Sequence, residues 1–342
     1  MTPQSFSAEI GGRTLTISSG QFAGLANGAV TVQYGDTIVL ATATLSKKLR
    51  EGIDFFPLLV DYEERLYAAG KIKGSRFIKR EGRASDEAIL TARLVDRSIR
   101  PLFDHNMRND VQVVLTVLSW DGENDADIPA LVGASAALMI SNIPWNGPIG
   151  AVRVGRIGGE WVLNPTYEAR DKSDLDLVLS ASRDHHVMIE GGANEVPEDV
   201  ILSGLDFAHK HVRKVIDLIE EMQKAIGREK IAIDVNTLTD EEQIAKEKLN
   251  VKVKAFAEGK LRGIWKMTDK QSREAAILAL TEELDQTLKA DSEVNKEQRL
   301  QGKHLLEELL DEDARVMVLE EGIRVDGRKL DEVRLLSAAV AL

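Results

Sequence analysis

A short basic segment is the part of this 342-residue chain whose residue types best suit a chemical task, the binding of an anion. Nine lysines and arginines lie between Lys71 and Arg100 against four acids. The segment therefore has a formal charge of +5, in a chain whose net charge is −12. A local cationic cluster on an acidic protein indicates one dedicated anionic partner. Phe77 adds an aromatic face, and basic groups beside an aromatic ring suit single-stranded nucleic acid.

The second half of the segment is predicted to form a helix that carries arginines. Ser85 can cap its start and Pro101 limits its end, so we expect a helix from about Asp86 to about Ile99. Two acids in its first turn suit the helix dipole. One apolar stripe should face the core, and it consists of Ala88, Ala92, Val95 and Ile99. A different side of the helix carries Arg93, Arg97 and Arg100.

The arginine face has two interpretations. Charge and spacing alone favour a solvated face on which Asp96 pairs with Arg93 or Arg100. The functional interpretation is an anion-binding surface next to a flexible loop. Glycines at 70, 74 and 82 make 71–83 such a loop, and loops are common sites of binding elements.

The motif FIKREGR at 77–83, followed by RLVDRSIRPLF at 93–103, resembles the first RNase PH-like domain of bacterial polynucleotide phosphorylase. The resemblance spans at least residues 10–225. It includes GAVTVQYGDTIVLATA at 28–43, DFFPLLVDYEERLYAAGKI at 54–72 and ENDADIPALVGASAALMISNIPWNGPIGAVRVG at 123–155. Three departures occur in the loop. Ile78 follows Phe77 where the family has a second aromatic, KIKGS stands for KIPGG, and Arg76 resembles a one-residue insertion.

The resemblance implies an α+β fold, with an RNase PH-like mixed-sheet domain over 1–225 and a small all-helical domain over 226–318. Short β-rich runs before residue 180 agree with the first domain, as does a regular apolar stripe that predicts a helix from about Glu198 to Ile226. A second helix is expected over Ile128–Ile143. The segment GIRVDGRKLDEVRLLSAAVAL at 322–342 resembles the opening of a second RNase PH-like domain, which we place at 319–342. We therefore expect the chain to be a fragment.

By resemblance, the complete enzyme degrades RNA from the 3′ end by phosphorolysis to nucleoside diphosphates. Its co-substrate is inorganic phosphate and its cofactor is Mg²⁺. In the family, the phosphate site and the metal-binding carboxylates belong to the second domain. We therefore expect no catalytic or metal-binding residue in this chain and no activity from it alone. The family forms a homotrimeric ring whose basic loops line an RNA channel. The resemblance assigns channel contacts to Phe77, Lys79, Arg80 and Arg83, with Arg93, Arg97 and Arg100 as second-line candidates.

Two other functions stay open. The first is a non-catalytic RNA-binding or scaffold subunit of an exosome-like ring, which needs nothing downstream. The second is a stand-alone RNase PH-type enzyme that trims tRNA. The helical insert and the second GIRVDGR start argue against the stand-alone enzyme. Partners of the complete enzyme could include an RNA-degradosome endonuclease or helicase.

Composition and other motifs exclude several classes of protein. The chain has no cysteine, which excludes disulfides and thiolate metal sites and agrees with a reducing cytoplasm. No uncharged apolar window reaches membrane-spanning length. The acids at 121, 123, 125 and 127 alternate like the start of a calcium loop, but Ala126 and Val132 stand at its glycine and glutamate positions. Walker A, GxSxG and HExxH motifs are absent.

Overall fold

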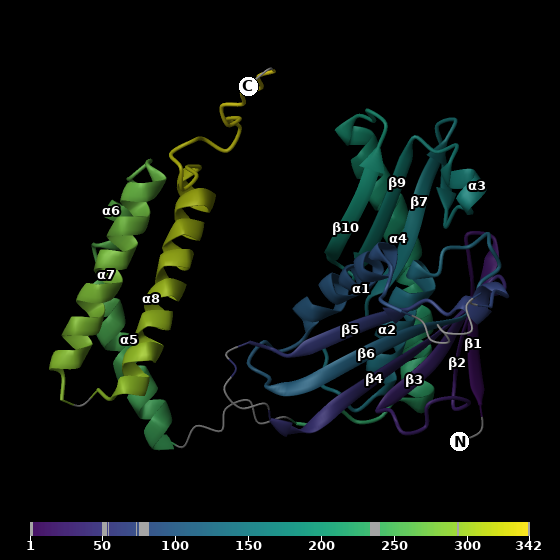
Figure 1. Cartoon of the computed structure of the whole chain (residues 1–342), viewed down its shortest axis with the longest axis horizontal. Helices are drawn as coiled ribbons and strands as arrows, with labels where there is room; N and C mark the ends of the chain where they lie inside the picture. Colours follow the sequence, from purple (N-terminus) through teal and green to yellow (C-terminus); the bar gives the residue numbers. More distant parts are fainter. Residues whose placement is uncertain are drawn as a thin grey trace. The chain divides into compact units, whose positions relative to one another are not determined.

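The computed structural model describes residues 3–49, 53, 55–72, 74, 82–232, 240–292 and 294–340. The chain divides into two compact units, Met1–Val235 and Asn236–Leu342, and each unit is described by itself (Figure 1). The first unit contains two β-sheets with helices packed on them, and the second contains helices.

The larger sheet of the first unit has six strands in the order β1-β2-β3-β4-β6-β5. Neighbouring strands are antiparallel except β5 and β6, which run parallel, so the sheet is mixed. Its strands are β1 (Gln4–Ile10), β2 (Arg13–Ser19), β3 (Gly28–Tyr34), β4 (Thr37–Leu49), β5 (Leu58–Glu63) and β6 (Asn109–Ser119).

Apolar and polar side chains alternate along these strands, so one face of the sheet is apolar and is covered by helices. In β3, Val30 and Val32 are buried, whereas Thr31 is only half-buried and Gln33 is exposed. The register pairs Val32 with Val39 of β4, which is also buried, so the apolar positions of the two strands share a face. Helices cover that face.

The smaller sheet has four antiparallel strands in the order β10-β9-β7-β8. They are β7 (Gly150–Ile157), β8 (Glu160–Leu163), β9 (Leu175–Ala181) and β10 (His186–Ala193), with the short helix α3 (Tyr167–Arg170) between β8 and β9. Strand β10 is therefore an edge strand. Its residues from Ile189 to Ala193 are exposed.

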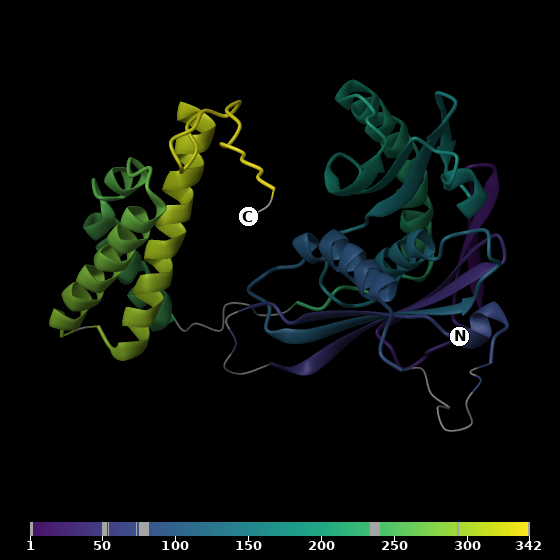
Figure 2. The same cartoon turned by 45° about the horizontal axis from the view of Figure 1, so that its top comes forward.

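Helices α1 (Asp86–Ile99) and α2 (Asp127–Ile140) lie between the two sheets (Figure 2). Helix α2 is buried along its whole length and contacts β3 and β4 of the larger sheet and β7 of the smaller one. The expected helix over Ile128–Ile143 therefore begins one residue earlier and ends three residues earlier. Ser141 caps its end, and the Ser141 hydroxyl donates to the carbonyl of Leu138 (2.7 Å).

The long helix α4 (Glu198–Ile226) has the predicted bounds, and its buried stripe packs on β7, β9, β1 and α2. Gly150 allows this close packing, since a Cβ there would lie 2.8 Å from the carbonyl oxygen of Val212. The mixed larger sheet and the antiparallel smaller sheet, with helices packed on them, confirm the predicted α+β class.

The second unit consists of α5 (Asp240–Ala257), α6 (Leu261–Trp265), α7 (Lys270–Ala290) and α8 (Lys296–Val316), followed by a wider turn at Met317–Glu321. Its core consists mainly of leucines from α5, α7 and α8, together with Val253 and Ala257 of α5 and Ile264 of α6. From 322 to 340 the described backbone contains one isolated bridge, Ile323 to Lys329, and no regular strand. Within the described ranges, no helix has both the length and the apolar character needed to span a membrane. The predicted boundaries at 225 and 318 stay predictions.

Candidate nucleic-acid interface

Helix α1 begins where the sequence predicts, and a second contact fixes its start. The Ser85 hydroxyl accepts a hydrogen bond from the backbone N–H of Ala88 (3.0 Å), which satisfies one free donor of the first turn. The same hydroxyl donates to the carboxylate of Glu64 (2.7 Å), which directly follows β5. The two ends of the intervening loop are therefore joined by a side-chain hydrogen bond.

The burial of α1 separates an inner face from an outer one. Ala88, Val95 and Ile99 are buried as predicted, Ala92 is half-buried, and Leu94 and Ser98 extend the inner face. The outer face carries Arg93 and Arg97, and Leu90 lies on it with 58% of its surface exposed. Three and four residues separate these positions, so they form one continuous strip of the helix surface.

The candidate RNA-contact residues fall into two groups. Phe77, Lys79 and Arg80 lie outside the described residues. Arg83 is exposed, just before the cap of α1. Arg93 is exposed, and no hydrogen bond or ion pair to its side chain is found within the described part of the chain.

Arg97 has one distant anionic neighbour. Its Nη1 lies 3.9 Å from Oε2 of Glu190 on β10, and about half of each side chain is exposed (54% and 51%). This contact joins α1 to the edge of the smaller sheet. An exposed pair at this distance holds its partners weakly.

Arg100 has a different environment. Its Nε and Nη2 donate to the two carboxylate oxygens of Asp96 (2.8 and 2.6 Å), one helical turn earlier. Its guanidinium also donates to the backbone carbonyls of Phe56 (3.3 Å) and Leu58 (3.1 Å). The pairing of Asp96 with Arg100 is one of the two pairings that the solvated-face interpretation allowed. Arg100 thus ties the end of α1 to the start of β5.

Among the described residues of the first unit, the largest ionic network is one that the sequence did not reveal. Arg153 of β7 contacts Asp127 and Asp176, the latter through two short contacts (2.7 and 2.8 Å). Arg170 of α3 contacts Asp125 and Asp176 (2.7 and 2.9 Å). Two strands, two helices and the residue Asp125 just before α2 supply these groups. The one available signal was a charged residue, Arg153, inside the apolar run AVRVG.

Burial dominates the electrostatics of this network. The loss of hydration raises the pKa of Asp127 to about 6, although the nearby guanidinium of Arg153 favours the charged carboxylate. Burial and the charge of Asp125 raise the pKa of Tyr167 to about 12. Asp127 is therefore ionised at neutral pH and takes up a proton on mild acidification.

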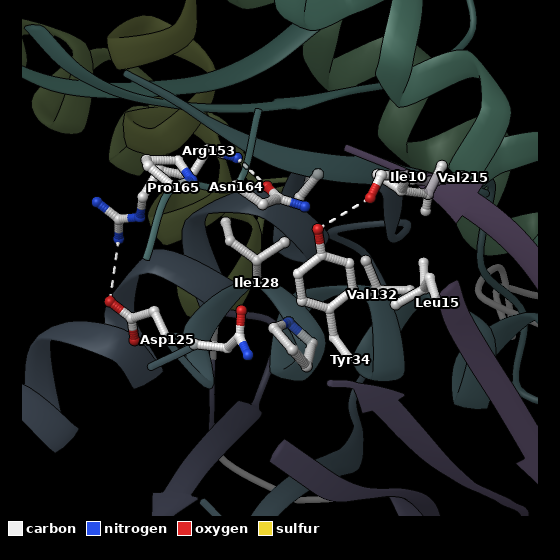
Figure 3. A pocket seen from close by; sticks show the side chains of 13 residues that line it. Ile10, Leu15, Tyr34, Asp125, Ile128, Val132, Arg153, Asn164, Pro165 and Val215 are labelled. Carbon is white, nitrogen blue, oxygen red and sulfur yellow. Dashed lines mark hydrogen bonds and ion pairs between the residues drawn. The ribbon is translucent and has the colours of Figure 1, made fainter. Parts of the chain in front are cut away.

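A small cavity lies next to this network, and Figure 3 shows its lining. Its volume is about 20 Å³, close to the space of one water molecule. Tyr34 donates its hydroxyl to the carbonyl of Ile10 (2.9 Å), and the side chain of Asn164 accepts from the backbone N–H of Arg153 (2.9 Å). The cavity is too small for a nucleotide, so it is a packing feature of the fold.

The fold also brings together two histidines that are far apart in the sequence. Nε2 of His186 on β10 lies 3.2 Å from Nδ1 of His209 on α4. The other ring nitrogen of His209 faces the carbonyl of Arg183 at 3.1 Å. Within the described ranges, no group of three or more His, Cys, Asp or Glu side chains is arranged to hold a metal ion.

Chemically, Arg93 and Arg97 on the strip, together with the exposed Arg83 just before α1, can bind phosphate groups. Guanidinium groups on an exposed helix face suit an extended, flexible polyanion, because they can pair with successive phosphates without fixing the bases.

Comparison with known proteins identifies the family of this chain. Three family models match in succession: 3′ exoribonuclease family, domain 1 (residues 11–144) and domain 2 (147–211), and polyribonucleotide nucleotidyltransferase, RNA binding domain (248–329).

Curated relatives agree with these models. Polyribonucleotide nucleotidyltransferases from Ruminiclostridium cellulolyticum and Heliobacterium modesticaldum are 45% and 46% identical over 99% of the chain. The one from Geobacillus kaustophilus is 44% identical over 98% of it. The chain spans about half the length of these relatives, 45–47% of each.

A solved structure resembles part of this chain in fold. The crystal structure of rice (Oryza sativa) Rrp46 matches 64% of this chain and 94% of its own, with a TM-score of 0.50 and 15% identity. At that identity the likeness concerns the fold alone. Because the sequence matches follow one order along almost the whole chain, the chain belongs to the 3′ exoribonuclease family and, within it, to the polyribonucleotide nucleotidyltransferases.

Proposed function

We propose that this chain supplies an RNA-contact surface to a phosphorolytic 3′-to-5′ exoribonuclease that acts in mRNA turnover. One observation carries the proposal. Helix α1 exposes Arg93 and Arg97 on one face, directly after a basic loop, in a member of the polyribonucleotide nucleotidyltransferases. Single-stranded RNA is the polyanion that this chemistry fits, since backbone contacts supply affinity without a sequence preference.

The complete enzyme would shorten RNA by one nucleotide at a time. An oxygen of inorganic phosphate forms a bond to the phosphorus of the last phosphodiester. The bond from that phosphorus to the 3′ oxygen of the preceding nucleotide breaks. A nucleoside diphosphate leaves, and the shortened RNA carries a 3′ hydroxyl. Cationic side chains around the phosphorus stabilise the charge that develops in the transition state.

Magnesium is the cofactor that the resemblance implies, and the described carboxylate cluster does not fit it. Asp125, Asp127 and Asp176 face Arg153 and Arg170, so guanidinium groups stand where a cation would bind. We therefore propose that the magnesium and phosphate sites of the complete enzyme lie outside this chain, and that the chain alone is inactive.

The inactivity is tested by the release of nucleoside diphosphate from poly(A) in the presence of phosphate and magnesium. We expect no release above a buffer blank. Release that survives repurification of the chain would refute the assignment of the chemistry to another part of the enzyme.

Within the RNA-contact surface we assign different roles to the basic residues. Phe77, Lys79, Arg80 and Arg83 are proposed as the first contacts with RNA, and Arg93 and Arg97 continue the path along α1. Arg100 supports the helix instead, because Asp96 and two backbone carbonyls already engage its guanidinium. In the complete protein, three copies would form a ring, and these residues would line its channel. The ring would act in the cytoplasm. An RNA-degradosome endonuclease or helicase is a proposed partner of that ring.

A double variant tests the surface directly. Arg93→Ala with Arg97→Ala should weaken the binding of a single-stranded RNA oligonucleotide for all sequences alike. It should also flatten the log–log salt dependence by about 0.7 for each lost phosphate contact. The matched control is Lys210→Ala with Lys214→Ala, which removes the same charge at the same spacing from exposed positions of α4. Equal effects of the two double variants would mean that only net charge matters, and no effect of the first would refute the surface.

A further inference from the structure

The contact between Arg97 and Glu190 occurs where the proposed RNA path passes the smaller sheet. Helix α1 and strand β10 approach each other there, as Figure 1 shows, and the ion pair is their one charged link within the described residues. The distance between Nη1 of Arg97 and Oε2 of Glu190 is 3.9 Å, and both side chains are exposed to solvent.

The three arginines on this side of α1 differ in how strongly the protein already binds them. Arg100 has four hydrogen bonds to Asp96 and two carbonyls, so a phosphate group would have to displace strong partners. For Arg93, no anionic partner is found among the described residues. Arg97 lies between these extremes, with one long and solvent-exposed contact that a phosphate could replace.

Strand β10 leaves the approach to Arg97 open. After Glu190 come Gly191, Gly192 and Ala193, so no long side chain follows on the edge strand. A Cβ placed on Gly192 would have no atom within 4 Å, which shows open space beside the strand. Glu190 is thus the one charged group that β10 presents next to the arginine strip.

We propose that Glu190 is an internal competitor for RNA: its carboxylate holds Arg97 in the RNA-free protein and must be displaced when a phosphate binds. This inference rests on the proposed function, and it adds a residue that sets how tightly the surface binds RNA. The carboxylate lowers affinity in two ways. It occupies Arg97, and after displacement it remains as a negative charge beside the phosphate.

The alternative role for Glu190 is to position Arg97 for RNA. The two roles predict opposite signs. A positioning carboxylate would be needed for full affinity, whereas a competing carboxylate reduces affinity. Replacement by glutamine distinguishes them, because the amide keeps the size and hydrogen-bonding ability of the side chain and removes only its charge.

The experiment measures binding of an oligo(A) RNA to the intact chain over a series of salt concentrations. We expect Glu190→Gln to bind about 2- to 5-fold more tightly at low salt, the range that corresponds to an exposed ion pair. The log–log salt slope should steepen by up to about 0.7, because Arg97 then exchanges solution anions rather than a carboxylate of the protein. Glu160→Gln is the matched control, since Glu160 is exposed on β8, the other edge strand of the same sheet.

The same substitution in a chain that lacks Arg97 distinguishes this inference from the proposed function. In a chain that carries Arg97→Ala, Glu190→Gln should change neither affinity nor slope beyond the effect of Glu160→Gln. Weaker binding by Glu190→Gln would overturn competition in favour of positioning. An equal gain from Glu160→Gln would reduce the effect to net charge, which also overturns it. If Arg97→Ala alone leaves affinity and slope unchanged, the RNA surface itself fails. The melting temperature of each variant verifies that the compared chains are folded.

Discussion

Replacing Arg100 should damage the fold rather than RNA binding, although Arg100 shares a helix with two proposed RNA contacts. Its guanidinium forms two short bonds to Asp96 and two longer ones to the carbonyls of Phe56 and Leu58. Arg100→Ala leaves the carboxylate without its partner and detaches the end of α1 from β5. Hydrogen bonds to charged groups contribute about 1.5–3 kcal/mol each, and they are not additive.

Solvent access to both side chains lowers the loss of stability that we expect. Arg100 is 35% exposed and Asp96 is 25% exposed, so water can replace part of the lost bonding. We therefore expect Arg100→Ala to lower the free energy of unfolding by about 2 kcal/mol. For a unit of this size, that corresponds to a melting temperature lower by about 4–8 °C. Arg100→Lys keeps the charge but not the planar set of donors, and it should recover less than half of the loss.

The assay is thermal unfolding followed by circular dichroism, with RNA titration of each variant below its melting temperature. Arg93→Ala is the control, because an exposed side chain without a partner among the described residues should change stability by less than about 0.5 kcal/mol. The reasoning would be refuted if Arg100→Ala melted like the unmodified chain and lost as much RNA affinity as Arg97→Ala.

Three further predictions concern the loop, the buried Asp127 and the half-buried Lys230. The triple variant Lys79→Ala, Arg80→Ala and Arg83→Ala should bind RNA of any sequence more weakly, and its log–log salt slope should flatten by about 0.7 per lost phosphate contact. Unchanged affinity and slope in titrations at several salt concentrations would mean that the loop has a structural role only. Asp127 has its pKa raised by burial to about 6, so the native chain binds a proton between pH 6 and 3.8 that the unfolded chain does not. Its contribution to stability should therefore rise on acidification through that window, and denaturant titrations should show no such gain in Asp127→Asn. Lys230 donates to three carbonyls at the end of α2, and burial lowers its pKa to about 8. The contribution of Lys230 to the free energy of unfolding should therefore increase as the pH rises from 8 to 10.5. Lys230→Met should be less stable than the unmodified chain at pH 7 by about 1–3 kcal/mol, because these carbonyls lose their donor. A variant of equal stability, or one with the same pH dependence, would contradict this.

Local signals were enough to predict some elements to the residue. Helix α1 has a capping serine, acids in its first turn and a proline just after its end, and α4 has a regular apolar stripe that stops at Gly227. Helix α2 was predicted less well. It is apolar on nearly every side, and apolar residues resume at Ile143 after only Ser141 and Asn142, so the hydrophobic pattern alone does not mark its end.

Tertiary contacts decided the rest of the site. Arg93, Arg97 and Arg100 look alike in the sequence, because all three lie on one side of a helix. They differ through what the other elements bring to them: Glu190 comes from β10, and the carbonyls that bind Arg100 precede or begin β5. These partners are about 40 or more residues away from α1 or its end, and no periodicity within the helix indicates them.

The hydrogen bond between Glu64 and Ser85 also bears on how freely the loop between them can change in length. The bond closes a span of about twenty residues, so the loop begins and ends at fixed points whatever its length. The entropy of closing such a span grows only with the logarithm of its length. One added residue, such as the insertion that Arg76 resembles, therefore costs less than about 0.1 kcal/mol. Selection can thus change the length or charge of this loop while the sheets and α1 keep their packing, so the proposed RNA-contact surface can diverge between relatives faster than the fold that carries it.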